Sequence, residues 1–256
     1  MKISITHKMK IFLSLIIVYA SFFLSSHALA ALLIIGEAKY LPDNNYYKLI
    51  YDNDVNGIPL TWLDFTCQKL PWYLTKDEWV YDLGASLEIA LYPEYTSDID
   101  WGVGWRLPLT VDGEFVKGYD GTTTGGYNIT SSEMGQLFYD ELNNIGSYDV
   151  NGQLNDWDDV LMNNTGPFDN LYLAFDGYWS DTTYSILGNC AWQFEMLTGF
   201  QSYLGKESYD LYGIAVHPGP VYARIPTIPI PTTMLLLGAG LVVLAGLGGE
   251  KIFKKG

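Results

Sequence analysis

The feature that most constrains this chain is an uncharged, apolar stretch near its carboxyl end. Residues 232–249 contain no charged side chain and consist mainly of Leu, Val, Ala and Gly. As a helix, these eighteen residues would extend about 27 Å, close to the thickness of a bilayer's hydrocarbon core. Lys251, Lys254 and Lys255 follow, and basic residues beside a span keep that end in the cytoplasm. A buried core helix is the alternative, but such a helix usually has a polar face, which this stretch lacks. We therefore expect a transmembrane helix.

The amino end has the layout of a secretory signal peptide. Three lysines in the first ten residues precede an apolar run over residues 11–24, and Ala28 and Ala30 supply the small residues of a cleavage site. An uncleaved membrane anchor is the alternative, but the run is shorter than the roughly 20 residues of a membrane span. We expect residues 1–30 to be removed and the following domain to be exported.

The charge of the expected mature chain limits its partners. Removing residues 1–30 takes away three lysines and no acids, so the formal charge changes from −15 to −18. Such a charge favours solubility and repels phosphate backbones, so nucleic acid is not an expected partner. The abundant tyrosine and tryptophan indicate a folded chain, and residues 31–225 have the length of one domain.

The cysteines and histidines are few. Cys67 and Cys190 are the two cysteines, and in an oxidising compartment they would either form one disulfide or remain free, because spacing alone does not test their geometry. His217 is the one histidine that follows the signal peptide. A histidine-based zinc site or catalytic triad needs further partners. These counts favour a protein that is not an enzyme.

Local patterns predict an α+β domain with two helices beside an antiparallel sheet. Capping boxes begin at Thr75 and Thr130, and apolar residues at helical spacing after each box predict helices over residues 76–90 and 131–143. The polar stretch 146–167 predicts a long surface loop. Strands are predicted over residues 60–65, 171–175, 178–180, 191–196, 199–203 and 212–217.

An acidic turn precedes the first predicted strand. Asp52, Asp54 and Asn56, followed by glycine, match the opening of an EF-hand calcium loop. Leu63 stands where that loop needs a bidentate glutamate, and Pro59 interrupts it. A turn that enters a strand is therefore the main interpretation, and calcium at another type of site is the alternative. No other cofactor is expected.

Aromatic side chains supply the candidate ligand contacts, because a ring face can stack against a sugar. Tyr119 and Tyr203 lie in polar, loop-like surroundings, and Trp101 lies in a passage rich in glycine and tryptophan. These three are the candidate binding residues. Trp105, Trp179 and Trp192 are expected in the core. Arg106, if buried, needs a carboxylate or carbonyl partner.

The carboxyl-terminal order of Pro229, Pro231, an apolar span and a basic tail resembles the PEP-CTERM sorting signal. The resemblance covers residues 226–256 and implies processing by an exosortase-type sorting machinery. Ile230 stands where the motif that names the family has glutamate, and the tail is built of lysines, whereas the family's is an arginine run. A plain single-pass anchor is the alternative.

Short motifs follow one another between the two ends of the chain. They are Thr61-Trp62-Leu63, Gly104-Trp105-Arg106-Leu107-Pro108, Ser132-Glu133-Met134, Tyr178-Trp179-Ser180, Ala191-Trp192 and Tyr212-Gly213-Ile214-Ala215-Val216-His217-Pro218-Gly219. Together they resemble the Lcl C-terminal-like domain over residues 49–221. The resemblance implies a C-type-lectin-like fold and a role in adhesion or in binding acidic glycans, although His217 stands where relatives usually carry arginine.

Together these patterns predict an exported, envelope-sorted, non-catalytic lectin-like module of the cell surface or extracellular matrix. The expected partners are the sorting machinery, the membrane through the carboxyl-terminal helix, and an extracellular polysaccharide. A structural matrix protein without a specific ligand and an enzyme acting on envelope polymers are the alternatives.

Overall fold

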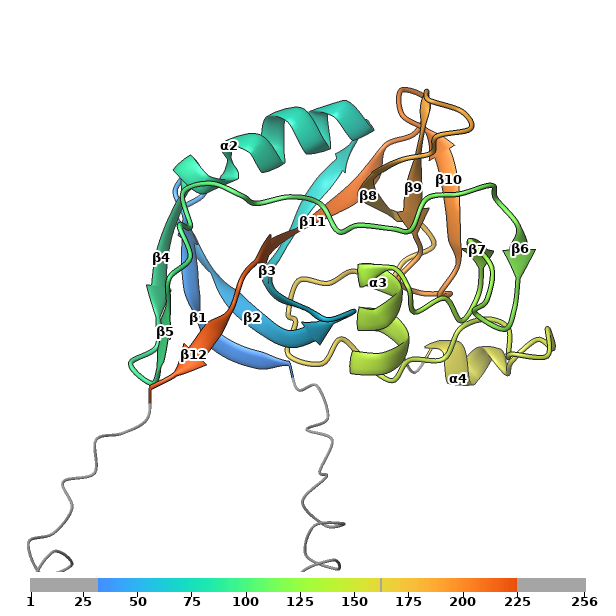
Figure 1. Ribbon diagram of the computed structural model, residues 1–256, viewed down its shortest axis with the longest axis horizontal. Helices are drawn as coiled ribbons and strands as arrows, with labels where there is room; N and C mark the ends of the chain where they lie inside the picture. Colours follow the sequence, from blue (N-terminus) through green and yellow to red (C-terminus); the bar gives the residue numbers. More distant parts are fainter. Residues whose placement is uncertain (1–31, 162, 225–256) are drawn as a thin grey trace, which may run out of the picture. The chain divides into compact units, whose positions relative to one another are not determined.

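A ten-stranded sheet organises the part of the chain that the computed structural model describes, residues 32–161 and 163–224 (Figure 1). Its strand order is β4-β1-β2-β3-β11-β8-β9-β10-β7-β6, and β12 (Val221–Ala223) pairs with β5 (Tyr95–Ser97) in a separate two-stranded sheet. The predicted signal peptide with Ala28 and Ala30, and the predicted sorting segment with Pro229, Pro231, Lys251, Lys254 and Lys255, lie outside the described residues.

One half of the sheet is an antiparallel meander. It consists of β1 (Leu33–Tyr40), β2 (Asn45–Val55) and β3 (Ile58–Leu70), with β4 (Leu87–Leu91) on the outer side of β1. A two-residue turn joins β2 to β3, where Asn56 and Gly57 have φ of 51° and 84°. Positive φ at both central residues matches the twist of the flanking strands, which is why Asn-Gly is the preferred hairpin turn.

The other half is joined to the meander through β11 (Leu211–Pro218). This strand pairs antiparallel with β3 on one side and parallel with β8 (Tyr178–Thr183) on the other. The order then continues through β9 (Cys190–Phe194), β10 (Gln201–Gly205), β7 (Gly125–Gly126) and β6 (Lys117–Gly118). The late strand β11 therefore joins the two halves of the sheet.

The first predicted helix forms but ends earlier than predicted. A continuous helical segment runs through η1 (Leu74–Val80), α2 (Tyr81–Leu83) and η2 (Gly84–Ser86), and the chain becomes extended at Leu87 to enter β4. Leu87, Ile89 and Leu91 are apolar at alternate positions, so a strand period also fits this sequence. Residues 87–91 pair with β1, and this pairing makes them a strand. The predicted capping box is wrong, because the helical segment already begins at Trp72, and the hydroxyl of Thr75 donates to the carbonyl of Pro71 at 3.1 Å.

The second predicted helix is present as α3 (Glu133–Gln136) and η3 (Leu137–Glu141). Its N-cap is Ser132, whose hydroxyl accepts the N–H of Gly135 at 3.1 Å, so the predicted cap at Thr130 is wrong by two residues. A short helix, α4 (Trp157–Leu161), lies inside the predicted loop 146–167.

The predicted strand 171–175 is wrong. These residues have no strand partner. In this part of the chain, backbone N–H groups form hydrogen bonds with side chains instead. The Tyr178 hydroxyl accepts the N–H of Tyr172 at 2.8 Å, and Asp64 accepts the N–H groups of Asp169 and Asn170 at 3.0 and 2.9 Å. The remaining predicted strands correspond to β3, β8, β9, β10 and β11 with shifted ends.

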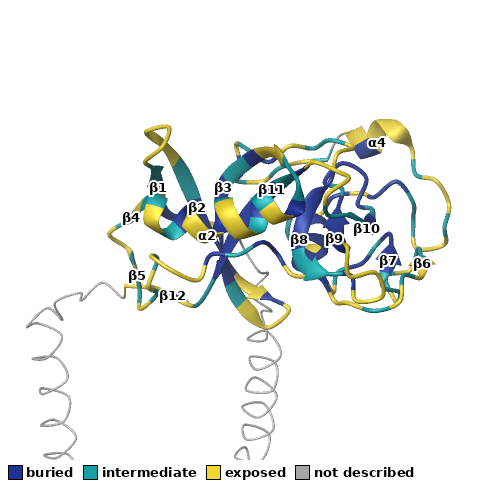
Figure 2. Ribbon diagram, turned by 90° about the horizontal axis from the view of Figure 1, so that it is seen from above, coloured by how far each residue is buried: buried dark blue, intermediate teal, exposed yellow. Residues whose placement is uncertain are grey.

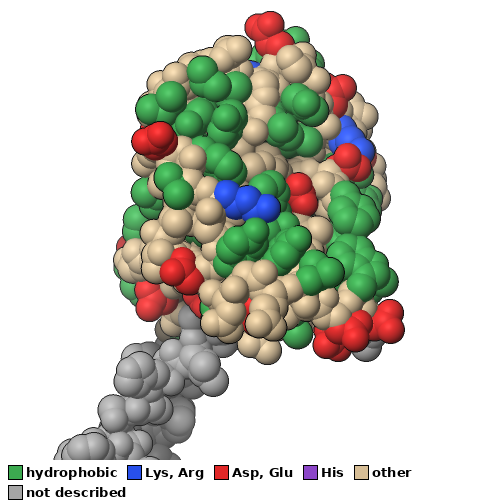
Figure 3. Space-filling view, turned by 90° about the vertical axis from the view of Figure 1, so that its right-hand side faces the viewer, with side chains coloured by type: hydrophobic (Ala, Val, Ile, Leu, Met, Phe, Trp, Pro, Cys, Tyr) green, Lys and Arg blue, Asp and Glu red, His purple; other side chains and the backbone are tan. Residues whose placement is uncertain are grey.

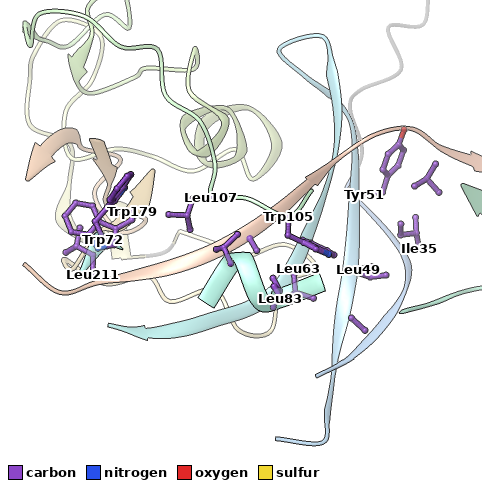
Figure 4. Packing of buried hydrophobic residues seen from close by; sticks show 14 of the residues in the cluster. Ile35, Leu49, Tyr51, Leu63, Trp72, Leu83, Trp105, Leu107, Trp179 and Leu211 are labelled. Atoms are coloured by element: carbon purple, nitrogen blue, oxygen red, sulfur yellow. The ribbon is translucent and has the colours of Figure 1, made fainter. Parts of the chain in front are cut away.

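The core follows the sheet. Buried residues concentrate where β3, β11, β8 and β9 lie side by side (Figure 2). One cluster extends from Trp72, Trp179 and Leu211 past Trp105 to Tyr51 (Figure 4). A second lies beneath α3 around Trp62 and Phe138, and a third surrounds Trp192. These positions confirm Trp105, Trp179 and Trp192 as core residues.

The described residues thus form a mixed α and β domain that is mostly sheet with few helices, as expected for the α+β class. Among residues 32–161 and 163–224, no helix is both long enough and apolar enough to cross a membrane.

Candidate functional site

The most exposed aromatic pair of near-parallel rings is formed by Trp157 and Phe175. Their side chains are 41% and 64% exposed, and their rings lie 5.7 Å apart at an angle of 10°. Trp157 begins α4, whose Val160 is fully buried and anchors the helix. Asp156 accepts the N–H of Asp158 at 3.0 Å and orders the first turn. The fold therefore holds two large apolar rings at the surface, next to acidic side chains.

Trp157 is not among the binding residues predicted from the sequence, although a signal for it is present there. The residue lies between Asn155-Asp156 and Asp158-Asp159, which is as polar a setting as those that singled out Tyr119 and Tyr203. An aromatic residue inside a run of acids is difficult to bury, because its neighbours must stay in water. The same criterion would have selected Trp157.

Tyr119 lies in a second aromatic group, around Lys117. The ammonium of Lys117 is positioned over the rings of Tyr119, Tyr127, Tyr148 and Phe200, at 5.5, 5.7, 5.7 and 5.6 Å from their centroids. We call these four rings the Lys117 platform. Tyr119 and Tyr148 are half-buried, while Tyr127 is buried. Burial, followed by the nearby charge of Glu195, raises the pKa of Tyr127 to about 12.

Tyr203 lies mainly within the third core cluster. It stacks on Tyr184 with centroids 4.1 Å apart at 18° and meets Phe115 edge-on at 5.4 Å. The neighbouring Trp192 donates its indole N–H to Asp112 at 2.8 Å. These contacts use most of the ring surface for packing, so the position favours a structural role for Tyr203.

Trp101 packs beside a cleft. Its ring lies 6.0 Å from Trp105 and 5.1 Å from His217. Two adjoining cavities of about 330 and 280 Å³ share Val80, Tyr81 and Trp105 in their walls. Three of the four charged side chains of the larger cavity are in ion pairs: Lys76 pairs with Asp181 at 2.5 Å, and Arg106 pairs with Glu133, while Asp77 joins no ion pair of the described residues.

The Arg106–Glu133 pair confirms the expectation that a buried arginine needs a carboxylate or carbonyl partner. Two N–H···O bonds of 2.7 Å join the guanidinium to both oxygens of Glu133, and the N–H of Leu109 donates to the same carboxylate at 2.7 Å. Both side chains are largely buried. The pair ties the segment after Trp105 to the start of α3, which is a structural task.

The acidic turn is the hairpin turn between β2 and β3. Its three candidate metal ligands do not converge on one point, because each has a different environment. Asp54 accepts the N–H of Gly57 at 3.0 Å, and the Asn56 amide donates to the carbonyls of Thr130 and Ser131 at 3.3 Å. Asp52 is fully buried on β2. Within the described residues, no three His, Cys, Asp or Glu side chains converge as metal ligands would. The turn interpretation accounts for this sequence.

Two buried carboxylate oxygens near this turn lack hydrogen-bond partners, namely Oδ2 of Asp52 and Oε2 of Glu141. Burial raises the pKa of Asp52 to about 6. Burial, and then the charge of Asp52, raises the pKa of Glu141 to about 7. Both acids therefore release their protons at a higher pH than exposed carboxyl groups do.

The disulfide between Cys67 and Cys190 is not formed, and both thiols are free and buried. Cys67 lies on β3 and Cys190 on β9, with β11 and β8 between them in the sheet. Three strand spacings correspond to about 14 Å, roughly twice the Cα separation that a disulfide can span. Burial also raises the pKa of the Cys67 thiol to about 12.

Comparison of the chain with protein-family models, with curated proteins and with solved structures found no match in any of the three.

Proposed function

We propose that this protein is an exported, envelope-sorted and non-catalytic lectin-like module that binds a glycan of the cell surface or extracellular matrix through Trp157 and Phe175. The observation that carries the proposal is the exposure of these two near-parallel rings at the surface. The apolar C–H face of a sugar ring stacks on such a surface, and the burial of both faces stabilises the complex.

Polar groups beside the rings suit the hydroxyl groups of a sugar. Asp156, Asp158 and Asp159 flank Trp157 in the chain, and Asp176, which pairs with Lys69, follows Phe175. Carboxylates accept hydrogen bonds from sugar hydroxyls without needing a donor of their own. The combination of an apolar platform and acceptors at its margin favours a neutral, hydroxyl-rich polysaccharide over an acidic one, because the acids would repel a second negative charge.

The ends of the chain support the location in this proposal. A signal peptide over residues 1–30 and a sorting segment over residues 226–256 would deliver the domain across the plasma membrane. We also propose that the domain has a C-type-lectin-like architecture. Helices packed beside a largely antiparallel sheet are compatible with it.

A glycan array probed with the full-length protein in detergent tests the proposal. Trp157→Ala should weaken retention of the bound polysaccharide at least about tenfold, because it removes one stacking surface of the pair. Tyr46→Ala is the matched control, since Tyr46 is 65% exposed and lies on β2 in the meander half of the sheet.

If the folded protein retains no sugar at high concentration, the glycan-binding proposal is wrong and a structural matrix protein becomes the better interpretation. Equal losses for Trp157→Ala and Tyr46→Ala would also overturn the assignment of the site. A purely structural effect of Trp157→Ala is recognised by a changed thermal unfolding midpoint, and Phe175→Ala then provides the second test of the same surface.

A further inference from the structure

Lys117 occupies a cation position that aromatic rings define. Its ammonium lies at nearly equal distances, 5.5 to 5.7 Å, from the four ring centroids of the Lys117 platform. Within the described residues, the ion pairs involve Lys48, Lys69, Lys76 and Arg106, and Lys117 joins none of them. The attraction that places this ammonium therefore comes from the electron-rich ring faces. Seen from the β6 end of the sheet, a basic side chain lies next to several hydrophobic ones, with an acidic side chain close by (Figure 3).

The four rings support one another without the lysine. The centroids of Tyr127 and Tyr148 are 4.8 Å apart, those of Tyr119 and Tyr148 5.1 Å, and those of Tyr127 and Phe200 5.1 Å. The backbone beneath them is also tied together. The amide of Asn128 donates to the carbonyls of Tyr119 and Tyr148 at 2.7 and 3.0 Å. The platform is thus preformed, and removal of the lysine side chain leaves its walls in place.

We propose that the Lys117 platform is a binding site for quaternary alkylammonium groups, such as that of choline, and that the ammonium of Lys117 is an internal stand-in that such a ligand displaces. A primary ammonium is strongly hydrated and sits on a flexible four-carbon stem. A quaternary ammonium carries methyl groups that match the apolar ring faces, which is how aromatic cages recognise choline and methylated lysine. The exposed Lys117 side chain can move into solvent to admit it.

The electrostatics of the surroundings favour a cation. Tyr127 senses the charge of Glu195, and the expected mature chain carries a formal charge of −18, that is −15 less the three lysines of residues 1–30. A negative protein raises the local concentration of cations. An anion would meet the negative ring faces as soon as it approached Lys117. The site is therefore assigned to organic cations and is independent of the glycan surface proposed above.

Calorimetric titration of the full-length protein in detergent with choline chloride tests the assignment. The neutral isostere 3,3-dimethyl-1-butanol is the ligand control, because it has the same shape without the charge. Lys117→Ala should bind choline about tenfold more tightly than the unchanged protein, since the internal competitor is gone, and should prefer choline to the isostere by about tenfold or more. Lys69→Ala is the protein control, because Lys69 is positioned over a single ring, that of Tyr212.

Tyr148→Leu, made together with Lys117→Ala, should abolish the preference for choline. If that double variant does not fold, Tyr119→Leu in the same background removes a different ring. The assignment is overturned if Lys117→Ala binds choline no better than the unchanged protein. It is also overturned if choline and the neutral isostere bind equally, which would indicate an apolar surface without cation recognition.

Discussion

The ionisable residues show how burial sets individual properties in this protein. Asp52 and Glu141 each keep one buried carboxylate oxygen without a partner, while Glu133 is fully engaged by Arg106 and Leu109. A folded-state pKa above the unfolded value means that the native state binds its proton more tightly. The native state then loses stability as pH rises from the unfolded pKa to the folded one.

We predict that the free energy of unfolding falls as pH rises from about 4 to about 7, because Asp52 and Glu141, whose pKa values are raised to about 6 and about 7, must give up protons in that window. Glu141→Gln should therefore be more stable than the unchanged protein at pH 8, by about 1–2 kcal/mol after allowance for the partial exposure of Glu141, and of similar stability at pH 4. Urea unfolding at both pH values measures this difference.

Glu94→Gln is the matched control, since Glu94 is an exposed acid, and it should change stability little at either pH. If Glu141→Gln and the unchanged protein are equally stable at pH 8, the charge of Glu141 does not destabilise the native state.

At the scale of elements, turn chemistry fixes how the strands meet. The β2–β3 hairpin has Asn56 and Gly57 in the left-handed region, and its tip docks on α3, because the N–H of Asn56 donates to the side chain of Gln136 at 2.7 Å. The turn thus sets both the register of the hairpin and its contact with a helix.

Gly57→Ala should destabilise the protein by about 1 kcal/mol, because φ of +84° is unfavourable for any residue with a Cβ atom. Crowding does not contribute, since a Cβ atom added at Gly57 has no neighbour within 4 Å. Gly188→Ala is the matched control: its Cβ position is equally open, but its φ is not in the left-handed region. Thermal unfolding midpoints compare the two, and equal midpoints would contradict the backbone argument.

At the scale of the whole molecule, strand order decides which distant residues meet. β11 and β8 separate the strands that carry Cys67 and Cys190, and the carboxyl-terminal half supplies β11 to complete the sheet of the amino-terminal half. The sequence separation of the two cysteines carries no information about this arrangement.

We therefore predict that the protein unfolded in urea without reductant reacts with Ellman's reagent at two thiols, the number of free cysteines in the structure. The native protein should react slowly, because both thiols are buried and the pKa of Cys67 is raised to about 12. If two reactive thiols appear only after reduction, the cysteines form a disulfide, which the strand order described above does not allow.

Sequence alone determined the features that depend on near neighbours. Alternation predicted β3, β8, β9, β10 and β11, and the chemistry of a buried guanidinium predicted that Arg106 needs a carboxylate or carbonyl partner. Tertiary structure alone decided that the first helix ends before Leu87, that Tyr203 packs inward while Trp157 faces solvent, and that Cys67 and Cys190 lie too far apart to pair. The reason is physical: periodicity and turn preference are local, whereas burial and pairing depend on which distant strand becomes the neighbour.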